Sequence, residues 1–281
     1  YGLDGTMRYE GSNRLGHSRT ARWLPTWNVS ARWNISDESW MHPLQPVLSH
    51  AALKASYSLT AESGPSWVTN SNAVYYARNI WRPVVGDMET SIDISSLANP
   101  DLTFEKKHEL NIGIELGFFD NRVNFIADWY DRNNYDLIGI TNTMGIGGEI
   151  TKYGNVAAMT SGGYELSLTT QNIRTKSFKW TTNFIWSHSH NMVTKLTTSK
   201  RVIDLVKGSG FAMEGYTNHS IFSIPFAGLN EEGLPTFYGP DGETTVTGIN
   251  FQLSDQEQLK YLKYEGTADP TGVGSIGNTI E

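Results

Sequence analysis

The 281-residue sequence has no cysteine, few charges and no long apolar run. Because cysteine is missing, a disulfide scaffold and thiolate metal sites are excluded. A transmembrane helix is excluded too, since it needs about 18 consecutive apolar residues and no such run occurs. Charged residues make up only 18% of the chain, and the net charge of -7 argues against a nucleic-acid partner.

Glycine and aromatic residues are abundant instead. The chain contains 27 glycines, and 12% of its residues are aromatic. This composition suits an outer-membrane β-barrel, and it also suits a soluble protein that binds carbohydrate. A barrel passes unnoticed in a hydropathy scan because only every second residue of its strands faces lipid.

The clearest pattern lies between residues 109 and 130. Apolar side chains alternate with polar ones through 110–118 and again through 123–130, with Asp120 and Asn121 between them. This period-two pattern predicts two antiparallel strands joined by a tight turn. Each segment has roughly ten residues, the length that a tilted strand needs to cross a bilayer. A soluble sheet alternates as well, but here the polar face carries charge and glycine, as the wall of a water-filled lumen would.

The same alternation recurs along the chain, and about eight strands are predicted. Their approximate ranges are 3–9, 27–34, 53–59, 110–118, 123–130, 164–169, 178–187 and 275–280. The predicted connections alternate in length. The shorter ones are Ser36–His50, Asp120–Asn121 and Thr170–Ser177, and the long ones are Ala61–Phe104, Tyr135–Ser161 and Met192–Pro270. Such alternation is typical of an up-and-down barrel with turns at one rim and long loops at the other.

Both ends of the sequence lie in strand-like stretches. The chain starts at Tyr1 without an initiator methionine or signal peptide, and it stops at Glu281. We therefore interpret it as a piece of a longer protein. An open sheet has free edges that a membrane does not tolerate, so other strands are expected to complete it.

Several passages, in order and at matching spacing, resemble the SusC/RagA family, which are TonB-dependent outer-membrane transporters of Bacteroidetes. The passages are Asn99–Glu105 followed by Glu109–Glu115, Gly117–Val123 with Asp128–Tyr130, Asn155–Val156 leading to Gly163–Leu166, Phe178–Asn183, Glu214–Tyr216, Phe226–Leu229 and Gly266–Pro270.

The resemblance implies an all-β fold, with residues 1–281 as part of the C-terminal half of a 22-stranded antiparallel transmembrane barrel and 192–270 as an extracellular loop region. The plug and the last strands would lie outside the sequence. It further implies location in the outer membrane of a Gram-negative bacterium and import of glycans or peptides driven through TonB. A SusD-like surface lipoprotein would be the partner, and transporter–lipoprotein pairs would form dimers.

Strand parity assigns the candidate residues to two faces of the wall. The polar residues predicted to face the lumen are Glu109, Asn111, Glu115, Asp128 and Glu165. The tryptophans predicted to contact lipid or form an aromatic belt are Trp27, Trp33, Trp129, Trp180 and Trp186.

The first long connection gathers aromatic and arginine side chains that suit a substrate or lid contact. They are Trp67, Tyr75, Tyr76, Arg78, Trp81 and Arg82. Sugars and peptides both bind flat aromatic faces beside planar polar groups. The alternative is that these residues pack the loop onto itself or onto the lipoprotein.

Candidate chemistry is weak elsewhere, and neither a cofactor nor an enzymatic activity is predicted. His188 and His190 share a strand face, but no third ligand follows at regular spacing, and an interfacial position beside Trp186 explains both. Paired lumen carboxylates would suit a glycosidase, although a solvated wall also needs them. The competing functions are a soluble carbohydrate-binding β-sandwich, a secreted glycosidase and a passive porin.

Overall fold

The computed structural model describes residues 1–68, 72–84, 86–145, 150–197, 205–206, 211–248, 257 and 259–281. Within them lie the strands β1 (Gly2–Gly11), β2 (Trp23–Asn34), β3 (Leu48–Glu62), β4 (Val74–Arg82), β5 (Asp87–Ser96), β6 (Glu105–Phe118), β7 (Val123–Asn142), β8 (Thr151–Arg174), β9 (Lys179–Leu196), β10 (Ser220–Ser223), β11 (Phe226–Leu229), β12 (Pro235–Tyr238), β13 (Thr245–Val246), β14 (Lys263–Thr267) and β15 (Gly272–Ile280). One short α-helix, α1 (Arg19–Arg22), and two 3-10 turns, η1 (Ile35–Asp37) and η2 (Ser39–Leu44), complete the elements.

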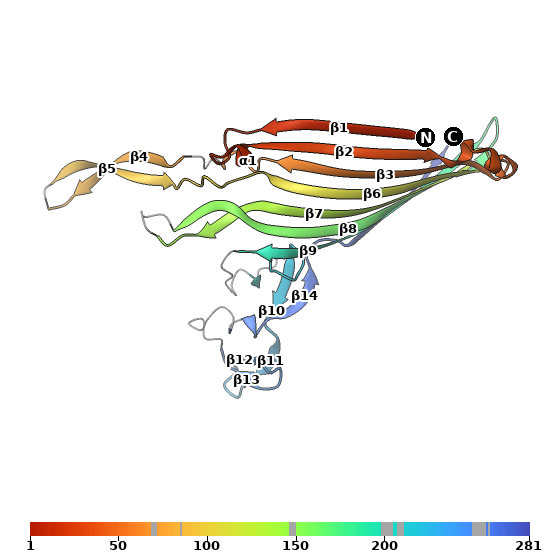
Figure 1. Cartoon of the computed structure of the whole chain (residues 1–281). Coiled ribbons are helices and arrows are strands. Elements are labelled where there is room, and N and C mark those ends of the chain that lie inside the picture. The colour runs from red at the N-terminus through yellow and green to blue at the C-terminus, as the bar shows by residue number, and fades with distance from the viewer. Residues whose placement is uncertain are drawn as a thin grey trace.

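Eight long strands form one curved antiparallel wall in the order β1-β2-β3-β6-β7-β8-β9-β15 (Figure 1). Every neighbouring pair is antiparallel. All eight predicted strands are therefore confirmed. No described helix has both the length and the apolar character needed to span a membrane.

The hairpin between β6 and β7 turns through three consecutive residues in the left-handed region. Phe119 and Asp120 both have φ of 54°, and Asn121 has φ of 58°. Asp and Asn tolerate this conformation better than most residues do. The Phe119 amide donates to the Val47 carbonyl at 2.9 Å, which ties the turn to the neighbouring connection.

The predicted connection Tyr135–Ser161 is wrong, because β7 continues to Asn142 and β8 begins at Thr151. The two strands are joined through 143–150 only. That connection is shorter than 35–47 at the opposite rim, so the strict alternation of short and long connections is wrong as well. The two longest connections, 63–104 and 197–271, do lie at the same rim as 143–150.

Both of these long connections contain strands that alternation did not predict. The first holds the β4–β5 hairpin, which projects beyond the end of the wall (Figure 1). The second holds the pair β10–β14 and the small sheet β11–β12–β13. Together they form an appendage beside the end of β9.

The rim with connections 12–22, 63–104, 143–150 and 197–271 is called the loop rim, and the opposite one, with 35–47, 119–122 and 175–178, the turn rim. The best-buried apolar cluster lies at the loop rim and not in the wall. Leu15, Val68 and Leu102 are fully buried, and Phe104 is 3% exposed. Wall side chains belong to one layer with two open faces, so many large apolar residues there stay exposed. A single sheet of this kind acquires an interior only when something covers its faces.

Candidate functional site

The strand register places the alternating apolar side chains on one face of the wall. Across four strands, Trp33 pairs with Leu53, Leu53 with Ile114, and Ile114 with Ala127. The row continues through Leu166 to Trp186. Since directly opposite residues in an antiparallel ladder share a face, the five predicted tryptophans all belong to this face. Trp129 and Trp180 are 45% and 37% exposed, which leaves them open to an apolar surrounding.

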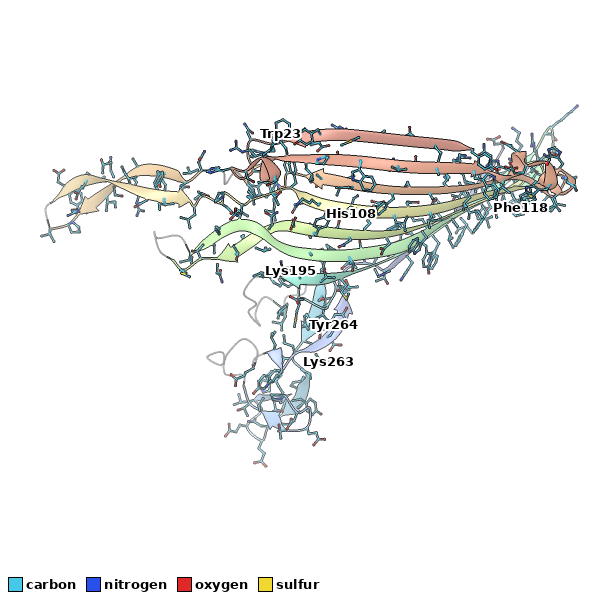
Figure 2. All side chains as sticks on the ribbon, viewed as in Figure 1. Trp23, His108, Phe118, Lys195, Lys263 and Tyr264 are labelled. Carbon is cyan, nitrogen blue, oxygen red and sulfur yellow. The ribbon has the colours of Figure 1, made fainter. Side chains whose placement is uncertain are left out.

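Aromatic side chains on this face stack across strands. Tyr57 and His108 lie with ring centroids 5.6 Å apart, and His108 and Tyr135 lie 5.7 Å apart. Trp27 meets Tyr57 edge-on at 5.4 Å. Figure 2 shows His108 on the wall between Trp23, nearer the loop rim, and Phe118 at the turn rim. A Trp–Tyr pair such as Trp27–Tyr57 adds about 0.5–1.5 kcal/mol beyond its burial.

The two histidines of β9 join a second stack. His188 lies 5.4 Å from the Tyr164 ring and 6.4 Å from the His190 ring. Within the described part of the chain, no group of three His, Cys, Asp or Glu side chains could hold a metal ion. Both histidines thus belong to an aromatic stack with Tyr164 and Trp186, and their interfacial position stays a prediction.

The opposite face of the wall carries ion pairs that the sequence analysis did not predict. Glu115 accepts from Arg32 at 2.7 Å and from Lys54 at 2.5 Å, and His50 lies 3.6 Å away. Three strands thereby contribute to one network, with partly exposed side chains. Alternation along each strand correctly assigns these cations to the polar face. It does not show which cation meets which carboxylate, because that depends on the register between strands.

A second network lies further along the same face. Glu109 contacts Arg132 at 3.1 Å and Lys107 at 2.9 Å. The guanidinium of Arg132 lies 4.1 Å from the centre of the Tyr130 ring, and Tyr130 is directly opposite Gly163. Of the three predicted lumen glutamates, Glu109 and Glu115 are therefore held by cations.

The β4–β5 hairpin separates the residues that the sequence grouped as one contact site. Tyr75 and Trp81 share a face with their cross-strand neighbours Ile94 and Met88. Tyr75 is 62% exposed and Trp81 is 56% exposed. The apolar residues of this face are Tyr75, Ala77, Trp81, Met88, Ile92 and Ile94, and the hydrogen-bonded pair Asn79–Thr90 lies among them. The face is called the apolar hairpin face below.

The other side of the hairpin carries the arginines. Arg78 pairs with Asp93, and Arg82 pairs with Glu89, while Tyr76 lies among them by parity. Because each guanidinium already has a carboxylate partner, neither arginine is a free anchor for an anionic ligand. Trp67 is 72% exposed and precedes the hairpin.

The appendage brings together two passages that are far apart in sequence. Tyr216 lies 4.9 Å from Tyr264 and 5.1 Å from Phe222, ring centre to ring centre. His219 contacts Asp269 at 2.8 Å. Figure 2 shows Tyr264 and Lys263 on this appendage, away from the wall.

Fold and register together define the wall of a transmembrane-type β-barrel. The sequence matches the family described as TonB dependent receptor-like, beta-barrel, over residues 1–225. The chain belongs to this family, which confirms the fold class and the family recognition.

Two curated relatives are also named TonB-dependent receptors. TonB-dependent receptor P39 of Formosa agariphila is 27% identical over 280 residues, covering 93% of this chain and 25% of the relative. TonB-dependent receptor SusC of Bacteroides thetaiotaomicron is 27% identical over 201 residues, covering 68% of this chain and 19% of SusC. The chain thus spans about a quarter or less of the length of these curated relatives.

Solved structures share the fold. The RagAB peptide transporter superposes with a TM-score of 0.78 at 24% identity, covering 99% of this chain and 30% of the solved one. The RagAB peptide importer in the "open-open" state gives the same TM-score at 23% identity, over 99% and 29% of the two chains.

Proposed function

We propose that this chain forms barrel wall and extracellular loops of a TonB-dependent importer in the outer membrane of a Gram-negative bacterium. The observation that carries the proposal is the register, which gathers the apolar rows on one face and the ion-paired polar rows on the other. In a barrel of the RagAB type, those faces would contact lipid and a water-filled or plugged lumen.

The cargo is proposed to be a glycan or a peptide, delivered with the help of a SusD-like lipoprotein. Support comes from the names of the relatives, since one is SusC and the solved structures are peptide transporters. None of these names describes an enzyme, and the chain is proposed to act by transport and not by hydrolysis. A passive porin is the second candidate, because a polar wall face serves diffusion as well.

The apolar hairpin face is proposed to contact either the lipoprotein or the cargo. Exposed aromatic side chains on a projecting hairpin have no covering element among the described residues, and large apolar patches mark interaction sites. Tyr75 and Trp81 replace the wider cluster expected from sequence as the residues most suited to this contact.

The test begins with the full-length protein expressed in its native outer membrane and solubilised in detergent. We expect a surface lipoprotein to co-purify, with bound glycan or peptide identified by mass spectrometry. Uptake of that cargo should stop when TonB is deleted. Uptake that continues without TonB would instead support the porin.

A matched pair of variants tests the hairpin. Trp81→Ala alters the apolar hairpin face, whereas Tyr76→Ala alters the opposite side of the same strand and serves as control. We expect Trp81→Ala to weaken lipoprotein co-purification or cargo uptake about tenfold or more, as hot-spot aromatics do. Equal behaviour of the two variants would remove the apolar hairpin face from the contact.

A further inference from the structure

The passage Asn99–Phe104, part of the stretch that resembles the SusC/RagA family, is held by several separate parts of the chain. The Gly16 amide donates to the Leu102 carbonyl at 2.7 Å, and the His17 amide donates to the Pro100 carbonyl at 2.9 Å. On the other side, the buried Asn99 donates from Nδ2 to the Tyr153 carbonyl at 2.8 Å. The passage therefore bridges the connection 12–22 and strand β8.

Asn155 of β8 is the most heavily bonded side chain in this region. Its Oδ1 accepts from the Thr103 amide at 2.9 Å, and its Nδ2 donates to the Thr103 carbonyl at 2.9 Å. The same Nδ2 donates to the Asp136 carbonyl at 2.5 Å. One amide thus satisfies both backbone groups of Thr103, as a strand neighbour would, and adds a bond to β7.

The bond to Asp136 falls where the β7 ladder is interrupted. Asp136 has φ of 57°, and the register with β8 shifts between Asn134 and Leu137. Residues that follow the passage fill the gap. Glu105 accepts from the Ile138 amide at 2.7 Å, and Lys106 reaches the Asp136 carboxylate at 2.6 Å. A bulge leaves backbone groups unpaired, and here side chains pair them.

Apolar packing fixes the same place. Val68 precedes the β4–β5 hairpin and Leu102 follows it, and both are fully buried against Leu15. A Cβ added to Gly16 would lie 1.9 Å from the Pro100 carbonyl oxygen, so only glycine permits this approach. Both roots of the hairpin therefore enter one core.

We infer that Asn155 is a positioning residue that latches the segment after the β4–β5 hairpin to strands β7 and β8. The segment before the hairpin is held to the same place through Val68 in the buried cluster. The latch consists of Asn155, Asn99, Thr103 and the buried cluster Leu15, Val68, Leu102 and Phe104. It fixes where the hairpin leaves the wall, and so the direction in which the apolar hairpin face is presented. Only the consequence for partner binding rests on the proposed function.

Hydrogen–deuterium exchange on the full-length transporter, purified with its lipoprotein, tests the latch. Asn155→Ala removes three hydrogen bonds at once. Because local opening is governed by local contacts, amides of 97–104 and of both hairpin roots should exchange about tenfold or more faster. Strands β2, β3 and β9 should keep their protection. The control is Asn183→Ala, which loses a single bond to Thr169 on an exposed part of β9.

Asn99→Ala is the milder second variant, since it removes only the bond to Tyr153 and the turn bond to Asp101. It should loosen the same segments less strongly. Unchanged exchange in 97–104 in both variants would overturn the latch, and so would a uniform rise along all strands.

A binding readout separates positioning from general stability. With the latch opened, lipoprotein affinity or the half-saturating cargo concentration should change severalfold while the amount of folded barrel stays constant. If exchange at the hairpin roots becomes faster but binding is unaltered, the latch is supported and the contact proposed for the hairpin is refuted. Slow exchange with altered binding would refute the latch.

Discussion

Replacing Gly163 by alanine tests the packing of the polar wall face. An added Cβ would lie 2.3 Å from the His188 carbonyl oxygen on β9 and 2.7 Å from the Tyr130 hydroxyl on β7. Tyr130 is directly opposite Gly163, so its ring occupies the space that a side chain would take. Covering a strand glycine with a cross-strand aromatic ring is a known way to stabilise a sheet. The ring in turn supports Arg132.

The two contacts have different consequences. A tyrosine ring can rotate away, whereas the His188 carbonyl belongs to the backbone of β9 and moves only with the strand. Overpacking of this kind costs about 1–3 kcal/mol, which corresponds to roughly 5- to 150-fold in the unfolding equilibrium. Gly154→Ala on the same strand is the control, because its Cβ would meet nothing closer than 3.5 Å.

The free energy of unfolding would be measured with the full-length protein refolded into liposomes, by urea titration and gel mobility with and without heating. Gly163→Ala should unfold at lower urea, and Gly154→Ala should stay close to the native protein. The double variant Tyr130→Ala with Gly163→Ala should not recover stability, since the His188 contact remains. Full recovery would show that the ring alone makes the position intolerant and would refute the backbone argument.

Two further predictions concern charged groups at the polar face and at the turn rim. Glu115→Gln should cost about 1 kcal/mol or less in urea titrations, because the side chains of Lys54 and Arg32 that it leaves unpaired are 36% and 42% exposed; a loss of several kcal/mol would contradict this. Hydrogen bonds from Trp33 and Tyr1 hold the pKa of Glu38 below its usual value. The stability that they contribute is present above the usual glutamate range and lost as pH falls through the lowered pKa. Trp33→Phe removes the larger of the two effects and leaves the Tyr1 bond, so it should make the loss of stability between about pH 6 and 3 less steep without abolishing it.

The strands of the wall could be predicted because apolar and polar residues alternate strictly wherever one face is apolar and the other is polar. Through 110–118 and 123–130, one face is apolar and the other polar, and the eight strands follow from that rule alone. The register could not be predicted in the same way. Which cation meets Glu115 depends on strand stagger, and Arg32 and Lys54 lie far from it in sequence.

The grouping of the hairpin residues failed for a related reason. Tyr75, Arg78 and Trp81 are close in sequence, so composition alone treats them as one site. A strand sends neighbours to opposite faces, and the cross-strand acids Asp93 and Glu89 then neutralise the arginines. The separation of the aromatic residues from the arginines can be predicted only if residues 74–96 are recognised as a hairpin. The two strands of this hairpin pair with each other and not with the wall.

The missed halves of β7 and β8 follow from the proposed membrane arrangement. β8 has 24 residues, a contour of about 80 Å at roughly 3.3 Å per residue. At a tilt of about 40° it would rise about 60 Å, some twice the thickness of the hydrocarbon core. Alternation is enforced only where one face meets lipid, so residues beyond the core have no reason to alternate. If Tyr164 of the aromatic stack lies at the interface, this geometry would place Asn155, nine positions before it, toward the loop side of the hydrocarbon. The wall itself, and not a long flexible loop, would therefore carry the latch and the β4–β5 hairpin out from the membrane surface.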